Sequence, residues 1–525
     1  MIAPLLWLVL AGPLALALIG LLPSATANAA PKHYAGLARL AALGTLVSAV
    51  VMAIVLARVG PLHTPVLPGL GLWFDTLTAV MFLLVSFVGT IVVSYSRNYM
   101  DGDADHGRFT KWLSFTLASV LLLILSGNLV LFGLAWLATS VGLNRLLLFY
   151  RDRPAAILAA RKKFIASRIS DLCLAIAFGI LWQMFGGLDY GTLFAGAKAL
   201  TAPTPGLTVA AFLFVIAALL KSAQFPLHGW LIEVMETPTP VSALLHAGII
   251  NAGGFLLLRF SDVLTLSTPA LDTLALFGGF TALFGSVVML TQSSIKVSLA
   301  WSTIAQMGFM MLQCGLGAWP AALLHIVAHS LYKAHAFLSS GSVIDIARAS
   351  WSPSPGGQPH PARMTIAVGL VLAVALTAGS LFGLSPLEQP GVFAFGTIML
   401  LGLTHLIAQA IDERPNMFVV VRTLGLAVLV AVAYYGLQFG AARLMATTLP
   451  EHAGARGVLT LVIAALTVLA FAAVAAFQST FARSGGSTRW QALYVHVTNG
   501  FYVNTIANRL VLRLWPTRAP LPATR

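Results

Sequence analysis

Charged side chains are scarce in this sequence of 525 residues: Asp, Glu, Lys and Arg make up 9% of it, whereas 58% is hydrophobic. The mean hydropathy of +0.90 excludes a soluble domain of this size, because too much apolar surface would face water. Apolar runs of about 20 residues, the length that crosses a bilayer, recur from end to end. They do not alternate with polar residues, which excludes a transmembrane β-barrel. The sequence therefore predicts an all-α polytopic membrane protein.

Cysteine is also scarce. Cys173 and Cys314 are the only two, and both fall inside apolar runs. Neither a disulfide framework nor a cysteine metal site follows from such positions. Free cysteine usually behaves as a small buried hydrophobe. We therefore expect no cofactor in this chain.

Acidic residues are few, 16 against 30 basic ones, which gives a formal net charge of +14. The cations lie in short loops between apolar runs, which argues against nucleic acid as a partner. Cytoplasmic loops of membrane proteins carry an excess of Lys and Arg. The loop 187–204 contains only Lys198, whereas the loop 145–163 contains Arg145, Arg151, Arg153, Arg161, Lys162 and Lys163. We expect a multi-pass protein of the cell inner (plasma) membrane, with the N-terminus outside and the C-terminus in the cytoplasm.

The apolar runs predict about 15 transmembrane helices in a domain over residues 1–480, followed by a cytoplasmic amphipathic tail over 481–525. The first run precedes ATANAA, which resembles a signal-peptide cleavage site. A secretory signal requires basic residues before its apolar run, and here there are none. We therefore interpret the run as a retained helix. The tail mixes apolar and basic residues, which is typical of a segment at the membrane surface. A docking site for a cytoplasmic partner has the same composition.

Ionisable residues inside the apolar runs need an explanation, because burying them in a membrane costs free energy. In HIVAHSLYKAHAF, residues 325–337, three of them recur every fourth residue and share one helix face: His325, His329 and Lys333. Imidazole titrates near pH ~6.5, and a desolvated lysine can release its proton below its usual range. Such a stripe can pass protons through intervening water. A polar patch that joins helices is one alternative. A zinc site is another, although HIVAH lacks the glutamate of HExxH and an obvious third ligand.

A second group of ionisable residues surrounds a proline-rich break in ALLKSAQFPLHGWLIEVMETPTPVSALLHAGIINAGGF, residues 218–255. Lys221 ends one apolar run and His246 lies in the next. Helices interrupted at membrane depth line cavities or pack inside the protein, and transporters use them. Glu233 and Glu236 lie in the break and could pair with Lys221 or another cation. The alternative is a re-entrant loop whose charges only reach water. Other acids lie deep in the runs or beside breaks: Asp171, Asp262, Asp345 and Glu388.

Three segments resemble the antiporter-like subunits of respiratory complex I and Mrp-type cation/proton antiporters. They are KSAQFPLHGWLIEVMETPTPVSALLHAG, SSIKVSLAWSTIAQMGFMM and HIVAHSLYKAHAFLSSGSV, and the distinctive motifs cover residues 70–345. The resemblance implies an antiporter-like fold with interrupted helices. In that family the corresponding lysines and histidines form a central proton-transfer axis. By resemblance this role falls on Lys221, His246, Lys296, His325, His329 and Lys333.

Two positions depart from the family pattern. The family carries a glutamate after a tryptophan in its fifth span, where this chain has Leu137 after Trp136. It also carries a lysine in a later broken span, whereas TIAVGLVLAVALTAGSLFGL, residues 365–384, is uncharged. The candidates to replace these groups are Glu233 or Glu236 for the first, and Glu388 or Arg422 for the second.

The segments HAGIINAGGFLLLRF and RDRPAAILAARKKF most resemble the membrane subunits, DabB, of DAB-type inorganic carbon pumps. The resemblance implies a transporter subunit rather than an enzyme. Its conduction of H+ or Na+ would drive hydration of CO2 to bicarbonate in a large cytoplasmic DabA-like partner that holds zinc. A proton-translocating subunit of a complex I-like or Mrp-type assembly is the alternative. A structural scaffold with an inactive charged axis is a third hypothesis.

Overall fold

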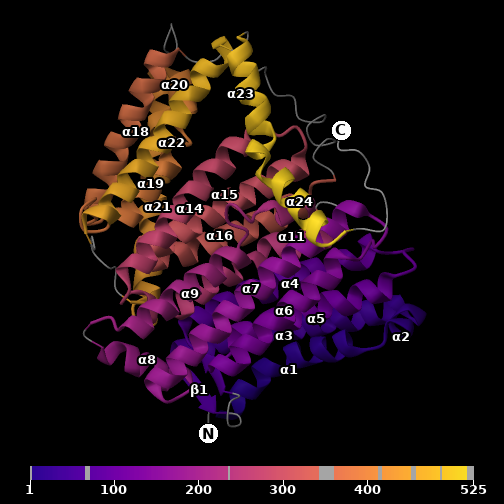
Figure 1. Ribbon diagram of the computed structural model, residues 1–525. Helices are drawn as coiled ribbons and strands as arrows, with labels where there is room; N and C mark the ends of the chain where they lie inside the picture. The colour runs from indigo at the N-terminus through magenta and orange to yellow at the C-terminus, as the bar shows by residue number, and fades with distance from the viewer. Residues whose placement is uncertain are drawn as a thin grey trace.

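The computed structural model describes residues 3–65, 71–200, 202–234, 237–341, 360–411, 417–450, 457–484 and 487–516. Glu236, a predicted site residue, and Asp345, one of the deep acids, lie outside these residues. The described chain is almost entirely helical (Figure 1). It also contains one antiparallel hairpin of two short strands, β1 (Leu62–Pro65) and β2 (Gly71–Phe74). The predicted all-α class is therefore confirmed.

The first part of the chain supplies eight helices among the described residues. They are α1 (Ala3–Leu21), α2 (Ser24–Ala29), α3 (Pro31–Val59), α4 (Thr76–Tyr99), α5 (His106–Leu125), α6 (Leu129–Leu147), α7 (Pro154–Phe185) and α8 (Tyr190–Ala199). Polar residues cap several of them. Asp75 accepts a hydrogen bond from the backbone N–H of Thr78 at the start of α4, and Asn128 accepts one from Leu131 at the start of α6. Such caps satisfy N–H groups that have no partner in the first turn of a helix.

The middle of the chain contains the predicted break. Its helices are α9 (Pro205–Lys221), α10 (Gly229–Glu233), α11 (Thr239–Ala247), η2 (Ile249–Asn251), α12 (Ala252–Arg259), α13 (Ser261–Leu264), α14 (Thr268–Met289), α15 (Ile295–Gly315) and α16 (Trp319–Leu338). Helix α9 ends at Lys221, as the sequence predicted. The buried Ala223 then adopts φ +51°, a left-handed conformation that is unfavourable for a residue with a side chain. The polar break therefore directly follows the lysine.

The last part of the chain contains α18 (Pro361–Leu381), α19 (Pro390–Leu401), α20 (Thr404–Ala410), α21 (Met417–Met445), α22 (Val458–Ser484), α23 (Thr488–Thr498), η3 (Gly500–Tyr502) and α24 (Val503–Leu514). The prediction that the later broken span lies in 365–384 is wrong. Helix α18 is continuous there, and the bent pair is α19 and α20, at 45° to each other. The bend follows Gly402, whose lack of a side chain permits a kink.

Among the described residues, eleven helices are long and apolar enough to cross a membrane, or twelve if the bent pair forms one span. Two shorter apolar helices, Leu6–Leu21 and α9, are additional candidates. Helix α16 is not among the eleven, because its histidines and lysine lower its hydropathy. A multi-pass membrane protein is thus supported, but the predicted count of about 15 transmembrane helices is not confirmed.

The helices form two groups that pack directly against each other, with α14, α15 and α16 on one side and α19, α21 and α22 on the other. Helices α1 to α16 share the principal apolar core, and α18 to α22 pack beyond α14–α16 (Figure 1). The yellow helices α23 and α24 run from α22 back towards the first group. Helix α24 contacts α7 and α10. The segment predicted to be an amphipathic tail therefore packs against the break that follows Lys221.

Candidate functional site

Lys221 is buried at the end of α9, with 2% of its surface exposed. Its ammonium group donates to the Trp136 carbonyl at 3.2 Å and to the Ser140 hydroxyl at 2.8 Å. It also lies 4.2 Å from the centroid of the Trp136 ring. All three contacts come from α6, the helix that lacks the family glutamate. Neutral dipoles and an aromatic face thus hold this lysine where a carboxylate was expected.

Asp171 on α7 supplies the negative charge near Lys221. It forms an ion pair with Arg168 at 2.7 Å and interacts electrostatically with both Lys221 and Lys163. Helix α7 packs along α9, which brings this acid beside the lysine. Asp171 is one of the acids deep in the apolar runs, but it was not among the predicted site residues. Its three-residue spacing from Arg168 was the available indication of a paired acid.

Glu233 pairs with a different lysine from the one first considered. Its carboxylate lies 2.7 Å from the ammonium group of Lys162 on α7. Asn504 and Asn508 of α24 donate to the same carboxylate at 3.1 and 2.9 Å. The sequence left open whether Glu233 pairs with Lys221 or with another cation; its partner is Lys162. Glu236 falls outside the described residues.

Lys163 follows Lys162 on α7 and is also buried, with 2% of its surface exposed. It donates to the Ser167 hydroxyl at 2.7 Å, and its ammonium group lies 4.8 Å from the centroid of the Trp230 ring. Residues 163, 167 and 171 are spaced by four and share one face of α7. Lys163 therefore lies on the same stripe as Asp171, one turn beyond Ser167.

The next buried group is His246 in α11. Its Nδ1 lies 2.9 Å from the Thr303 hydroxyl of α15, and its ring stacks on Phe337 with centroids 4.3 Å apart. Neutral polar groups occupy the space between Lys221 and α16. The Ser222 hydroxyl donates to the Ile250 carbonyl at 3.0 Å, and the Asn251 amide donates to the Ser330 hydroxyl at 2.9 Å.

Lys333 of α16 is fully buried, with 0% exposed. It donates to the Leu299 carbonyl at 2.9 Å and to the Ser302 hydroxyl at 2.8 Å, both on α15. This environment resembles that of Lys221: one carbonyl and one serine hydroxyl on a neighbouring helix. Lys296, at the start of α15, is only partly buried and lies 3.5 Å from the Thr239 hydroxyl. Lys296 thus lies at the edge of the group rather than inside it.

His325 and His329 complete the stripe on α16, with ring centroids 6.1 Å apart. His329 is buried and His325 half-buried. Within the described part of the chain, the Nε2 atoms of both rings and of His246 are buried and have no hydrogen-bond partner. Buried polar atoms normally have a partner in the protein or in ordered water. We call the buried groups from Lys221 through His246 to Lys333, His329 and His325 the series. Three such atoms along this series are suited to bound water.

Several candidates lie away from this series. Glu388 and Arg422, the candidates to replace the late lysine, are exposed on the surface. Where the bent pair α19–α20 kinks, the described polar side chains include His405 and Gln409, 3.1 Å apart. Tyr332, beside the stripe in sequence, is 59% exposed. These placements leave the far end of the pathway without a charged residue from the sequence prediction.

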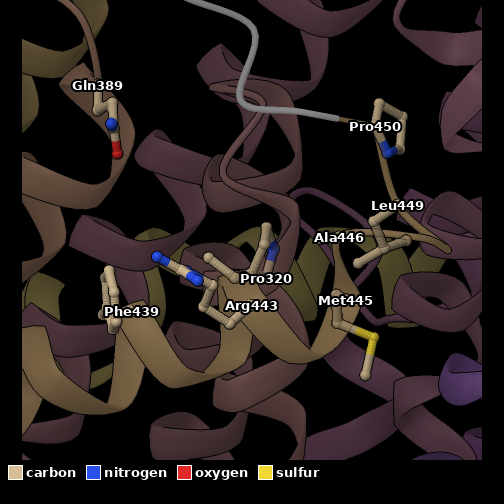
Figure 2. A pocket seen from close by; sticks show the side chains of 9 residues that line it. Pro320, Gln389, Phe439, Arg443, Met445, Ala446, Leu449 and Pro450 are labelled. Carbon is tan, nitrogen blue, oxygen red and sulfur yellow. The ribbon is translucent and has the colours of Figure 1, made fainter.

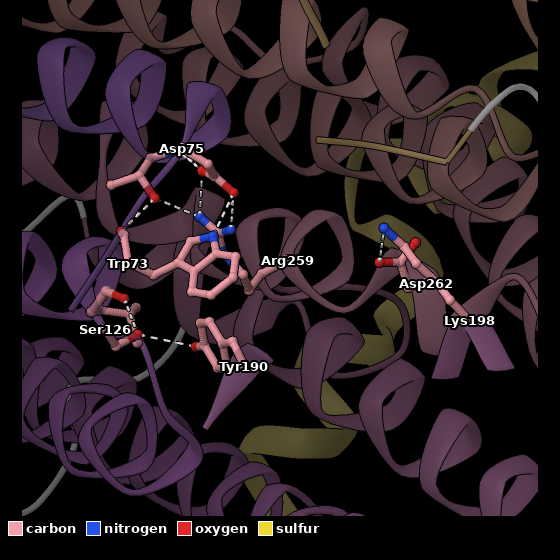
Figure 3. Close-up of polar contacts among 9 residues, drawn as sticks. Trp73, Asp75, Ser126, Tyr190, Lys198, Arg259 and Asp262 are labelled. Carbon is pink, nitrogen blue, oxygen red and sulfur yellow. Dashed lines mark hydrogen bonds and ion pairs between the residues drawn. The ribbon is translucent and has the colours of Figure 1, made fainter. Parts of the chain in front are cut away.

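Two other polar regions lie apart from the series. Arg259 forms a buried pair with Asp75 at 2.6 Å, supported by the Trp73 indole N–H, while Lys198 and Asp262 pair nearby at 3.7 Å (Figure 3). A cavity of about 400 Å³ opens where α16 begins and α21 ends (Figure 2). Arg443, Gln389 and Pro320 are among its lining residues, and none of the predicted site residues lines it.

Comparisons with known proteins agree with the motif pattern. Residues 126–352 match a family described as NADH:quinone oxidoreductase/Mrp antiporter, TM. Residues 67–110 match one described as NADH-ubiquinone oxidoreductase (complex I), chain 5 N-terminus. The first of these segments contains every residue discussed above from Lys162 to Lys333.

Curated relatives extend the similarity over most of the chain. The chain is 42% identical over 450 residues to the probable inorganic carbon transporter subunit DabB2 of Halothiobacillus neapolitanus, covering 86% of this chain and 81% of that protein. It is 37% identical over 446 residues to the probable inorganic carbon transporter subunit DabB of Hydrogenovibrio crunogenus, covering 85% and 83%. It is also 37% identical over 353 residues to NADH-quinone oxidoreductase subunit L of Mycobacterium tuberculosis, covering 64% and 55%.

Solved structures share the fold. A chain of the Mrp complex from Dietzia sp. DQ12-45-1b matches 99% of this chain and 58% of its own length, with a TM-score of 0.56 and 23% identity. A chain of the membrane-bound sulfane sulfur reductase, an archaeal respiratory membrane complex, matches 95% of this chain and 99% of its own length, with a TM-score of 0.57 and 16% identity. At these identities the likeness shows the fold alone, and it confirms the predicted antiporter-like fold.

Proposed function

We propose, from the premise that this chain belongs to the DabB group of antiporter-like membrane subunits, that it conducts H+ or Na+ to energise inorganic carbon accumulation. The family membership rests on the 42% identity to a DabB2 protein over 86% of this chain. A membrane transporter subunit follows from that membership. The conducted ion, the partner and the coupling to carbon chemistry belong to the proposal.

One observation carries this proposal: Lys221 and Lys333 are both buried and are held by neutral groups. Each donates to one backbone carbonyl and one serine hydroxyl of a neighbouring helix. A lysine locked to a carboxylate keeps its proton, whereas a desolvated lysine on neutral acceptors can release it. His246 and His329 offer imidazole groups between and beside the two lysines. The series thus has the chemistry needed for proton transfer in short steps.

Asp171 has a separate role in this proposal. Its charge stabilises protonated Lys221, while its ion pair with Arg168 competes for the same carboxylate. A shift of Asp171 towards either cation would change the proton affinity of Lys221. We propose this balance as the device that loads and unloads the lysine.

The proposed partner is a large cytoplasmic DabA-like subunit that holds zinc and hydrates CO2 to bicarbonate. The names of the two inorganic carbon transporter relatives support a subunit of such an assembly. We place the chain in the cell inner membrane, with its N-terminus outside and its C-terminus in the cytoplasm. The positive loop at 145–163 supports this orientation.

A second candidate function is proton translocation in a complex I-like or Mrp-type assembly. The identity to subunit L of Mycobacterium tuberculosis favours it, although that match covers 64% of this chain. The absence of an acid at Leu137 counts against it, because that family carries a glutamate there.

Uptake of radiolabelled inorganic carbon in cells without carbonic anhydrase separates these functions. The chain is expressed with and without the protein encoded beside it, and Lys221→Met serves as the variant. We expect uptake that needs both proteins and is lost in Lys221→Met. An assembled complex without uptake would overturn the carbon-accumulation proposal and favour the second candidate.

A further inference from the structure

The inner end of the Lys221 region is covered by the C-terminal helix. Asn504 and Asn508 lie one turn apart on α24, and both contact the pair formed by Lys162 and Glu233. Lys162 donates to the two side-chain carbonyls at 2.7 and 2.6 Å, while the two amide groups donate to Glu233 at 3.1 and 2.9 Å. Each asparagine therefore bridges both charges. The four side chains form a closed polar cluster, which we call the clasp.

The clasp excludes water from its ion pair. The side chains of Lys162 and Glu233 are 8% and 13% exposed. The packing is close, because a Cβ atom added at Gly229 would lie 1.8 Å from the Asn504 side-chain oxygen. Gly229 begins α10, and the following residue, Trp230, faces Lys163. Through Gly229 and Trp230, α10 therefore contacts both the clasp and the buried stripe that leads to Asp171.

Apolar contacts anchor α24 on both sides of the clasp. Before it, Gly500 packs on the Trp301 ring, and Phe501 packs on Phe284 with centroids 6.3 Å apart. After it, the Trp515 ring packs on Phe164 and under the Arg161 guanidinium. Water can replace the amide contacts of the clasp one for one, but it cannot replace these apolar contacts. The segment can therefore release its centre while its ends stay attached.

The face of α24 opposite the clasp is apolar. Ile506, Leu510 and Leu514 are 64%, 56% and 72% exposed there. An apolar face of this kind on an amphipathic helix suits contact with the surface of the membrane. The helix thus contacts the bundle through its polar face and presents an apolar face away from it.

We propose that the clasp is the inner gate of the ion pathway: α24 seals it when Asn504 and Asn508 hold Lys162 and Glu233, and opens it when they release them. The inference rests on the proposed function, because a gate needs a pathway. Glu233 and Lys162 are then the first ionisable groups that an ion or proton from the cytoplasm meets. Lys163 and Asp171 follow towards Lys221. Asn504 and Asn508 are positioning residues that act through this pair.

A disulfide across the clasp tests whether α24 must move. The position for a Cβ atom at Gly229 lies 3.3 Å from that of Asn504, close to the ~3.5–4.5 Å of disulfides. The variant is Gly229→Cys with Asn504→Cys, in a chain with Cys173→Ala and Cys314→Ala. The intact complex is reconstituted in liposomes, and proton flux under an imposed potential is measured with an internal pH-sensitive dye. Asn504→Cys alone is the matched control.

We expect oxidation to lower the flux of the double variant by at least about tenfold, because locking removes the open population. Reduction restores it, and oxidation leaves the single variant unchanged. Equal flux in the oxidised and reduced double variant would overturn the gate, because a static helix does not need to move. Lys221→Met in the same assay tests the pathway itself. If that variant conducts normally, the proposed function fails independently of the gate.

A second measurement covers the case in which the reduced double variant does not conduct. Lys163→Cys in the same cysteine-free background places a thiol behind the clasp, and its rate of reaction with a charged maleimide is measured in the intact complex. We expect Asn508→Ala to raise that rate about tenfold, since an opened clasp admits the reagent. Unchanged labelling after Asn508→Ala would contradict the gate without any reference to flux.

Discussion

Asp171 places a negative charge near Lys221 in a chain that lacks the family's own acid. The family places its acid on the fifth span, whereas this chain carries Leu137 there and supplies a negative charge from α7 instead. The ion pair with Arg168 fixes the carboxylate beside Lys221. A negative charge near the central lysine is thus retained without a direct ion pair, and a different helix provides it.

Asp171→Asn should therefore lower ion-driven carbon uptake without preventing assembly. The amide keeps the size of the side chain but removes the charge that stabilises protonated Lys221. A charge interaction of ~1.4 kcal/mol shifts that proton equilibrium about tenfold, and we expect uptake to fall by a similar factor. The measurement is radiolabelled uptake at matched expression. Asp171→Glu, which keeps the charge, should retain more uptake than Asp171→Asn. Equal uptake by the native chain and Asp171→Asn would remove this role.

Helix α16 has one buried and one exposed face, and each carries a histidine, which permits a matched comparison. His329 is 5% exposed with an unpartnered Nε2, whereas His335 lies on the exposed side of the same helix. We expect His329→Ala to reduce ion-driven uptake and His335→Ala to leave it near the native level. Uptake is measured as before, with membrane abundance as the control for expression. Equal effects of the two substitutions would indicate a general disturbance of α16 rather than proton transfer.

The sequence located the lysines and histidines of the pathway because a charge inside an apolar run is conspicuous. It did not identify the groups that hold them, such as Ser140, Ser302 and Thr303, since hydroxyls are common in transmembrane helices. Asp171 was noted but not assigned, because its approach to Lys221 depends on how α7 packs against α9. Contacts between distant segments are set by packing, which one sequence does not specify.

At the scale of helices, the sequence predicted the first of the two helix interruptions but misplaced the second. Prolines at 226, 238 and 240 predicted the break after Lys221, because proline removes a backbone hydrogen-bond donor. The bend between α19 and α20 follows Gly402 within an apolar run, and no proline marks it. The sequence therefore placed the later break one helix too early. The pairing of Glu233 with Lys162 was equally hidden, since it depends on the return of α24.

The buried pair of Arg259 and Asp75 joins the ends of α12 and α4 and should matter for stability. The guanidinium donates to both carboxylate oxygens and to the Thr78 hydroxyl. Removing one partner of a buried pair leaves an uncompensated charge and costs about 3–5 kcal/mol. We expect Arg259→Met to lower the thermal unfolding temperature of the purified protein clearly.

Lys198→Met is the matched control for this prediction. Lys198 is 67% exposed and lies 3.7 Å from Asp262, so its pair is hydrated. Exposed pairs contribute ~0.2–1 kcal/mol, and the unfolding temperature should change little. If both substitutions have the same small effect, the Arg259 pair is not a structural joint.

At the scale of the whole molecule, the proposed pathway joins six helices of the first group. Helices α6, α7 and α9 form the surroundings of Lys221, while α11, α15 and α16 form those of His246 and Lys333. The two lysine environments share their chemistry, and the neutral groups of Ser222, Asn251 and Ser330 lie between them. Helix α24 then returns from the far end of the chain to cover the pair of Lys162 and Glu233. Buried polar groups thus extend from the contacts of the C-terminal segment towards the centre of the bundle.

The composition of this series favours protons over sodium ions. Sodium, a hard cation, is held by oxygen ligands, as the hard cations calcium and magnesium are. The described series instead consists largely of lysines and histidines, which repel a metal cation when protonated and carry a proton by their own chemistry. We therefore expect carbon uptake to collapse with a protonophore at constant sodium, and to persist when sodium is replaced by potassium. Uptake is followed with radiolabelled inorganic carbon in cells that express the complete complex. If uptake instead follows external sodium and survives the protonophore, the buried lysines serve as a fixed positive scaffold, and conduction must use the hydroxyl and carbonyl oxygens around them.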